Sequence, residues 1–228
     1  MRILDFLLVV PVLLFSVIAH EYAHGYAALK QGDDTALMLG RLTWNPIKHI
    51  DPFMTVLLPL MLWMVHGPLL GGAKPVPVDP RKYRNYRRGD IIVSLAGVFT
   101  NLLLALASVI VFVLAGLAGR AAPAAGNTLA IVQAMMFIGL KLNLVLIAFN
   151  LIPIPPLDGS HVMKYLLPAS WALRYQQFGK YGIIVLLLLL AMPNGVLDVW
   201  MRPAFMFGGL LLRWADPFSL PTLNQWLS

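Results

Sequence analysis

Long apolar segments alternate with short polar loops along most of the chain. A helix needs about 20 predominantly apolar residues to cross the roughly 30 Å hydrocarbon core of a bilayer. Three segments meet that length: Leu4 to Leu29, Ile91 to Ala118, and Leu129 to Ile152, the last interrupted by Lys141. Two shorter apolar segments, Tyr181 to Met192 and Val199 to Leu212, flank Pro193-Asn194-Gly195 and are expected to form a C-terminal pair.

The segment from Phe53 to Leu70 has two interpretations. Its uninterrupted apolar core is short and contains Pro59, so it either crosses the membrane or re-enters it. A crossing puts the basic loops on either side of it on opposite faces and gives six helices with both termini inside. Re-entry puts both loops in the cytoplasm, which the positive-inside rule favours. The sequence therefore predicts an all-α polytopic membrane protein with about six transmembrane helices, one of which spans or re-enters. Short extended loop segments, Gly40 to Asn45 and Lys74 to Val78, are expected near its active site.

Composition supports a membrane location. Hydrophobic residues make up 59% of the chain and charged residues only 12%, against about 25% charged in average soluble domains. The net charge of +7 comes from basic residues beside apolar segments, which is typical of groups facing anionic lipid rather than nucleic acid. There is no cysteine, so any metal must be held by His, Asp or Glu.

A possible metal motif lies inside the first apolar segment, at His20-Glu21-Tyr22-Ala23-His24. On a helix this spacing puts two imidazoles on one face, where both can bind one zinc ion, and Glu21 is then placed to act as general base. The five residues alone are a weak signal, because a polar turn at the membrane interface would look the same. Charged and metal-binding groups within a membrane are usually functional, and this favours a site.

A second polar motif ends the third long segment, at Asn150-Leu151-Ile152-Pro153-Ile154-Pro155-Pro156-Leu157-Asp158-Gly159. The prolines break the helix, and Asp158 is expected to begin a new one. Asp158 is therefore either an N-cap or the third metal ligand. Catalytic zinc takes three protein ligands plus water, and His20 and His24 supply two. In the absence of cysteine, Asp158 is the best-placed candidate for the third.

These two motifs resemble those of the site-2 protease family of intramembrane zinc metalloproteases, in its compact bacterial branch. Gly97-Val98-Phe99-Thr100-Asn101 is similar to a further family motif, with Val98 in place of proline. The resemblance implies that His20, His24 and Asp158 bind one Zn²⁺ and that Glu21 is the general base. It also implies that Asn150 contacts the substrate carbonyl or oxyanion. Asn101 is a candidate for lining a polar cavity.

The function predicted from this resemblance is hydrolysis of peptide bonds in or near transmembrane segments of membrane proteins. The partners are then a membrane-protein substrate and the lipid bilayer, and the location is a bacterial cell membrane. Two alternatives are a catalytically silent relative that acts as a scaffold and a metal or ion transporter. The protease core is expected over residues 1–165, with a C-terminal helical hairpin over 166–228 in the same membrane domain. The sequence assigns no role to Lys141 or His161.

Overall fold

The described part of the computed structural model comprises residues 3–57, 60–61, 64, 72–191 and 195–227. Its regular structure is helical, and these residues contain no β-strand. The α-helices are α1 (Ile3–Gln31), α2 (Thr35–Met38), α4 (Tyr86–Ala121), α5 (Gly126–Asn150), α6 (Asp158–Met163), α7 (Ala169–Phe178), α8 (Gly182–Ala191), α9 (Val196–Ala215) and α10 (Asn224–Leu227). Short 3₁₀ or π turns join them: η1 (Pro46–His49), η2 (Pro52–Leu57), η3 (Pro80–Lys82), η4 (Pro123–Ala125), η5 (Gly179–Tyr181) and η6 (Asp216–Phe218). The predicted all-α class is confirmed.

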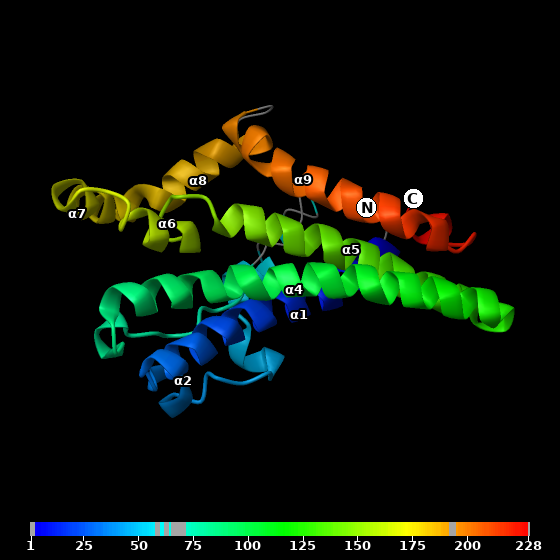
Figure 1. Cartoon of the computed structure of the whole chain (residues 1–228), viewed down its shortest axis with the longest axis horizontal. Coiled ribbons are helices and arrows are strands. Elements are labelled where there is room, and N and C mark those ends of the chain that lie inside the picture. Colours follow the sequence, from blue (N-terminus) through cyan, green and yellow to red (C-terminus); the bar gives the residue numbers. More distant parts are fainter. Residues whose placement is uncertain (1–2, 58–59, 62–63, 65–71, 192–194, 228) are drawn as a thin grey trace.

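Three described helical segments are long and apolar enough to cross a membrane: Phe6–Gln31, Tyr86–Ala121 and Pro123–Asn150. They correspond to the three longest apolar segments of the sequence, and their helices α1, α4 and α5 lie side by side along the long axis of the molecule (Figure 1). Most of the segment 53–70 lies outside the described residues, so the count of six stays a prediction.

Local sequence signals explain where the long helices begin and end. The Asn85 side chain accepts a hydrogen bond from the Arg88 backbone N–H at 3.0 Å and so caps the start of α4. At its far end, α5 stops at Asn150, three residues before Pro153, where a proline cannot continue the helical hydrogen bonds. The chain then turns and resumes as the short helix α6.

Helices α1 and α4 are antiparallel, and two contacts between them are four residues apart on each helix. His24 Nδ1 lies 2.7 Å from the carbonyl oxygen of Val93. One turn away, the His20 ring lies against Gly97, where a Cβ atom would come within 2.4 Å of the ring. Small residues permit such close approach of membrane helices. The metal motif on α1 therefore faces the first half of α4.

The end of α1 and the start of α4 are held together. The Arg84 backbone N–H donates to the carbonyl oxygen of Gln31 at 2.8 Å, and Lys82 Nζ lies 2.8 Å from Asp34 Oδ1. The chain therefore leaves α1 and enters α4 at the same end of the bundle.

Helix α5 packs against both α1 and α4. Its Gln133 Nε2 donates to the carbonyl oxygen of Phe112 in α4 at 3.0 Å. Asn143 Nδ2 donates to Ser16 Oγ of α1 at 3.0 Å. Gln133 Nε2 donates to the Phe218 carbonyl oxygen, and Gln133 Oε1 accepts from the Leu220 backbone N–H. These bonds tie the C-terminal segment to the bundle, while α9 packs along α5 (Figure 1).

Candidate active site

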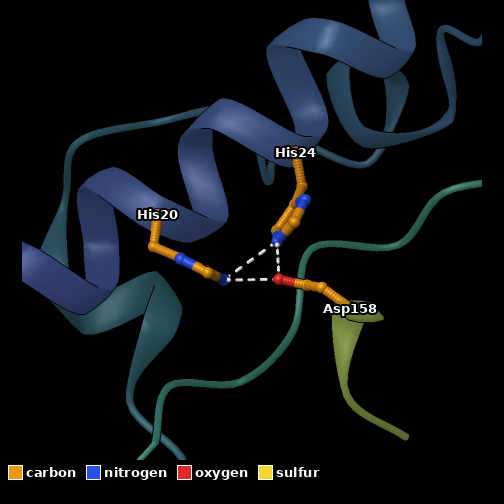
Figure 2. A group of neighbouring side chains, drawn as sticks. All are labelled: His20, His24 and Asp158. Atoms are coloured by element: carbon orange, nitrogen blue, oxygen red, sulfur yellow. Dashed lines mark hydrogen bonds and ion pairs between the residues drawn. The ribbon is translucent and has the colours of Figure 1, made fainter. Parts of the chain in front are cut away.

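Two histidines of the metal motif converge as their helical spacing predicts. His20 and His24 stand one turn apart on α1, and their Nε2 atoms are 3.0 Å from each other. His20 is buried, with 6% of its surface exposed. Both rings reach inward from α1 toward the same point (Figure 2).

Asp158 reaches that point from the opposite side of the site. It is the first residue of α6, which follows the proline-containing turn after α5. Its Oδ2 atom lies 3.2 Å from His20 Nε2 and 3.4 Å from His24 Nε2 (Figure 2). His24 and Asp158 are 134 positions apart in the sequence, and both contribute to one group of atoms that could hold a metal ion.

The geometry of these three atoms fits a zinc ion. Zinc–nitrogen bonds of about 2.0–2.1 Å in a tetrahedron separate neighbouring ligand atoms by about 3.3 Å. The His24 Nδ1 proton is directed at the Val93 carbonyl oxygen, which leaves the Nε2 lone pair of the neutral ring free to bind a metal. Asp158 Oδ2 is buried, and apart from the two imidazole nitrogens it has no polar partner among the described residues, as suits an oxygen that faces a cation.

Glu21 stands beside this group without belonging to it. Its Oε2 atom accepts a hydrogen bond from the Val76 backbone N–H at 2.8 Å. Val76 belongs to the irregular segment 72–79, and its side chain packs against Gly25, one turn after Glu21 on α1. The 72–79 segment therefore runs beside the metal motif and fixes one oxygen of the carboxylate.

Gly97 is a site residue whose function sequence reasoning missed. A Cβ atom at this position would lie 2.4–2.6 Å from three atoms of the His20 ring, closer than van der Waals contact allows. Gly97 therefore leaves space that the ring of a proposed ligand fills. The available signal was its place in the motif that includes Asn101, but nothing in that motif says which side chain the glycine faces.

The other candidate residues lie outside the group of three. Asn150 Nδ2 donates to the Leu146 carbonyl oxygen of its own helix at 3.0 Å. Asn101 is fully buried, and neither of its amide atoms has a hydrogen-bond partner among the described residues. His161 Nδ1 lies 3.3 Å from Asp90 Oδ1, and Lys141 Nζ lies 4.1 Å from the centre of the Phe137 ring.

Comparison with known proteins identifies the family. The family model described as "Peptidase family M50" matches residues 8–128 and 113–192. The chain belongs to this family. The resemblance to the site-2 proteases is thereby confirmed, and with it the prediction of a membrane metalloprotease.

Individual relatives agree with this assignment. The chain is 42% identical to "Putative zinc metalloprotease YwhC" of Bacillus subtilis (strain 168) over 188 residues, which cover 82% of each protein. It is 30% identical to "Putative zinc metalloprotease Rip2" of Mycolicibacterium smegmatis over 189 residues, which cover 82% of this chain and 68% of Rip2. No solved structure matches the chain significantly.

Proposed function

We propose that this M50 peptidase is an intramembrane protease with one zinc ion per chain, held by His20, His24 and Asp158, and with Glu21 as its general base. The convergence of three ligand atoms from α1 and α6, within 4.8 Å of one another, carries this proposal. Among the described residues, no second group of three His, Asp or Glu side chains is spaced to hold a metal. A single centre of this kind suits hydrolysis better than transport, which usually uses polar groups on several helices or an internal repeat.

Each protein group then has a definite task. Zinc, when bound, supplies Lewis acidity, which lowers the pKa of water to about 7 and polarises a carbonyl. Glu21 takes the proton from the attacking water and passes it to the leaving amine. The Val76 N–H holds one Glu21 oxygen, so the other is free to receive that proton. The Val93 carbonyl keeps the His24 ring in its metal-binding tautomer and orientation.

Asn150 completes the proposed site on the α5 side. Its amide N–H can donate to the substrate carbonyl or to the oxyanion that forms from it, in the manner of an oxyanion hole. This contact requires the amide to leave the Leu146 carbonyl, to which it now donates. Asn101 is proposed to line a polar cavity that leads water to the site, because its buried amide has both a donor and an acceptor to satisfy.

The substrates proposed are membrane proteins with a transmembrane segment, cleaved in or near that segment within a bacterial cell membrane. We further propose that residues 53–70 re-enter the membrane instead of crossing it. The Gln31–Arg84 hydrogen bond supports this, because the chain returns to the end of the bundle that it left. Both basic loops then face the cytoplasm, as the positive-inside rule requires.

Two variants test the proposed centre. Wild-type protein is expected to carry about one zinc per chain, and His24→Ala to lose it because only two ligands remain. Glu21→Gln keeps both zinc and fold, and we expect it to lose about 10²–10⁴-fold or more in cleavage rate, because the base is gone. Zinc content is measured by elemental analysis. Cleavage is followed by comparing the membrane proteomes of cells with wild-type and Glu21→Gln protein.

The outcomes separate the two assignments. Full zinc content in His24→Ala would reject the ligand set, whatever the activity. Normal proteolysis by Glu21→Gln would reject Glu21 as the base and leave the ligand set standing. The expected result is a single-span membrane protein that accumulates uncut only with Glu21→Gln.

A further inference from the structure

A cavity of about 270 Å³ lies between α1 and parts of the chain that include η1 and residues after it. Its α1 wall is formed by apolar side chains. Its opposite wall is formed by Pro46, His49, Ile50, Thr55, Leu60, Gly72 and Ala73. The α1 wall consists of Phe6, Val10, Leu13, Leu14, Val17 and Ile18. The described lining is therefore almost wholly apolar.

The cavity lies along the face of α1 that carries Glu21. Val10, Leu14, Val17 and Glu21 follow one another at steps of four, three and four residues, which is the spacing of one helical face. Val17 precedes Glu21 by four residues, about 6 Å along the helix axis. The apolar wall is thus the direct continuation of the proposed catalytic face.

The opposite wall is tied to the same site. Gly72 and Ala73 line the cavity, and three residues later the Val76 N–H holds the Glu21 carboxylate. The Lys74 N–H donates to the carbonyl oxygen of His49, another lining residue, at 2.8 Å. One short segment of chain therefore borders both the cavity and the proposed base.

From this arrangement we infer that the cavity is a substrate subsite that receives one large apolar side chain, leucine- or phenylalanine-like, within two residues of the cleaved bond. An apolar cavity of about 150 Å³ binds benzene, so this one has room for an aromatic ring or a branched aliphatic group. An extended residue spans about 3.3 Å, so one or two residues cover the distance from Glu21 to Val17. Gly72 and Ala73 fill little of the cavity, because glycine has no side chain and alanine has only a methyl group.

This inference rests on the proposed zinc centre. In the test, every probe is anchored at that centre through a group that binds zinc. The probes are two sets of short peptides, each with a zinc-binding hydroxamate. In the first set the hydroxamate is at the carboxyl end of the peptide. In the second set it is carried by a succinyl group at the amino end. In each set the first or the second side chain from the hydroxamate is varied from glycine to alanine, leucine and phenylalanine. Affinities are measured on zinc-loaded protein in nanodiscs of one lipid composition.

We expect the affinity to increase about tenfold or more from glycine to leucine in at least one series, because added methylene groups bind favourably in an apolar pocket. Leu14→Trp fills the cavity from the α1 wall, and Ala73→Leu fills it from the opposite wall. In each variant the affinity for the leucine probe should therefore fall close to the affinity for the glycine probe. Leu7→Trp is the matched control, because Leu7 lies on α1, is 60% exposed and does not line the cavity. It should keep the wild-type series.

Each remaining result has a definite meaning. If the affinities for wild-type protein do not depend on the side chain of the probe, the subsite is overturned. The cavity would then be assigned to a lipid chain. An unchanged series in both filled variants, or an equal loss of glycine and leucine probes, would overturn the subsite as well. Failure of the glycine probes to bind wild-type protein would instead reject the zinc centre, since those probes have no side chain to place in the cavity.

Discussion

At the scale of single residues, particular neighbours position the two histidines that we propose as zinc ligands. His24 is oriented by a backbone carbonyl of α4, and His20 occupies space that only glycine leaves open. Groups that orient metal ligands typically change metal affinity by about 10–100-fold when they are altered. Val93 contributes only a backbone atom, so Gly97 is the neighbour that substitution can test.

Gly97→Ala should weaken zinc binding. The new methyl group would lie 2.4–2.6 Å from the His20 ring, so the ring must leave its present position, in which Nε2 meets His24 and Asp158. We expect about a 10–100-fold loss of zinc affinity, measured by competition with a chelator of known affinity.

Gly209→Ala is the matched control for this change. Gly209 also lies within a long helix, α9, but a Cβ atom there would meet nothing within 4 Å. Alanine in place of a helical glycine should raise stability by up to about 1 kcal/mol and leave zinc affinity unaltered. Wild-type affinity in Gly97→Ala would show that the His20 ring has room to adjust.

At the scale of helices, the placement of α6 decides whether Asp158 reaches the histidines. Asp90 of α4 is buried, with 2% of its surface exposed, and it binds α6 and the residues after it. Lys164 Nζ lies 2.5 Å from Asp90 Oδ2, and the Tyr165 hydroxyl donates to the same atom at 2.9 Å. Burial and the bond to Asp90 raise the pKa of Tyr165, so its hydroxyl stays a donor.

Asp90→Ala is expected to make the position of α6 less well defined. Because Asp158 is the first residue of α6, the arrangement of His20, His24 and Asp158 is expected to change with it. Loss of the carboxylate leaves Lys164 poorly solvated and unpaired, which costs about 3 kcal/mol, and it removes the bonds that orient α6. Unfolding in mild detergent measures the loss of stability, and chelator competition measures the accompanying loss of zinc affinity.

The control for Asp90→Ala is Asp198→Ala, at an exposed acidic residue in the first turn of α9. Its effect should not exceed about 1 kcal/mol, the size of a charge–helix-dipole interaction. If Asp90→Ala were as stable as this control and bound zinc like the wild type, α6 would be held by its backbone packing alone.

The long helices could be predicted from the sequence because their formation depends on local hydropathy. Helices α1, α4 and α5 confirm that prediction. The sequence did not predict how they pair, because a helix that is apolar on all sides has no polar face to reveal its buried one. The His20–Gly97 contact and the Asp90–Lys164 pair depend on that pairing. The metal group was accessible to sequence reasoning because ligand chemistry restricts the candidate residues, wherever they lie along the chain.

At the scale of the whole molecule, every proposed catalytic group gathers toward one end of the bundle. The metal motif lies near the end of α1, Val93 and Gly97 near the start of α4, and Asp158 just after the end of α5. The antiparallel order of the three helices brings these parts of the chain together (Figure 1). The loops with basic residues such as Arg41, Lys74 and Arg81 lie at that same end, so the proposed site is expected nearer the cytoplasmic face.

Thiol labelling tests this topology without background, because the chain has no cysteine. Met38→Cys and Arg81→Cys place single thiols on the two basic loops. Met38 is 77% exposed, and the Arg81 side chain is 87% exposed. Ala124→Cys places one in η4, between α4 and α5, at the opposite end of the bundle. With re-entry of residues 53–70, an impermeant reagent should label only Ala124→Cys in intact cells, and all three after lysis. Labelling of Met38→Cys but not Arg81→Cys in intact cells would mean that residues 53–70 cross the membrane. The Gln31–Arg84 hydrogen bond cannot form in that arrangement, because its two partners would lie on opposite faces of the bilayer.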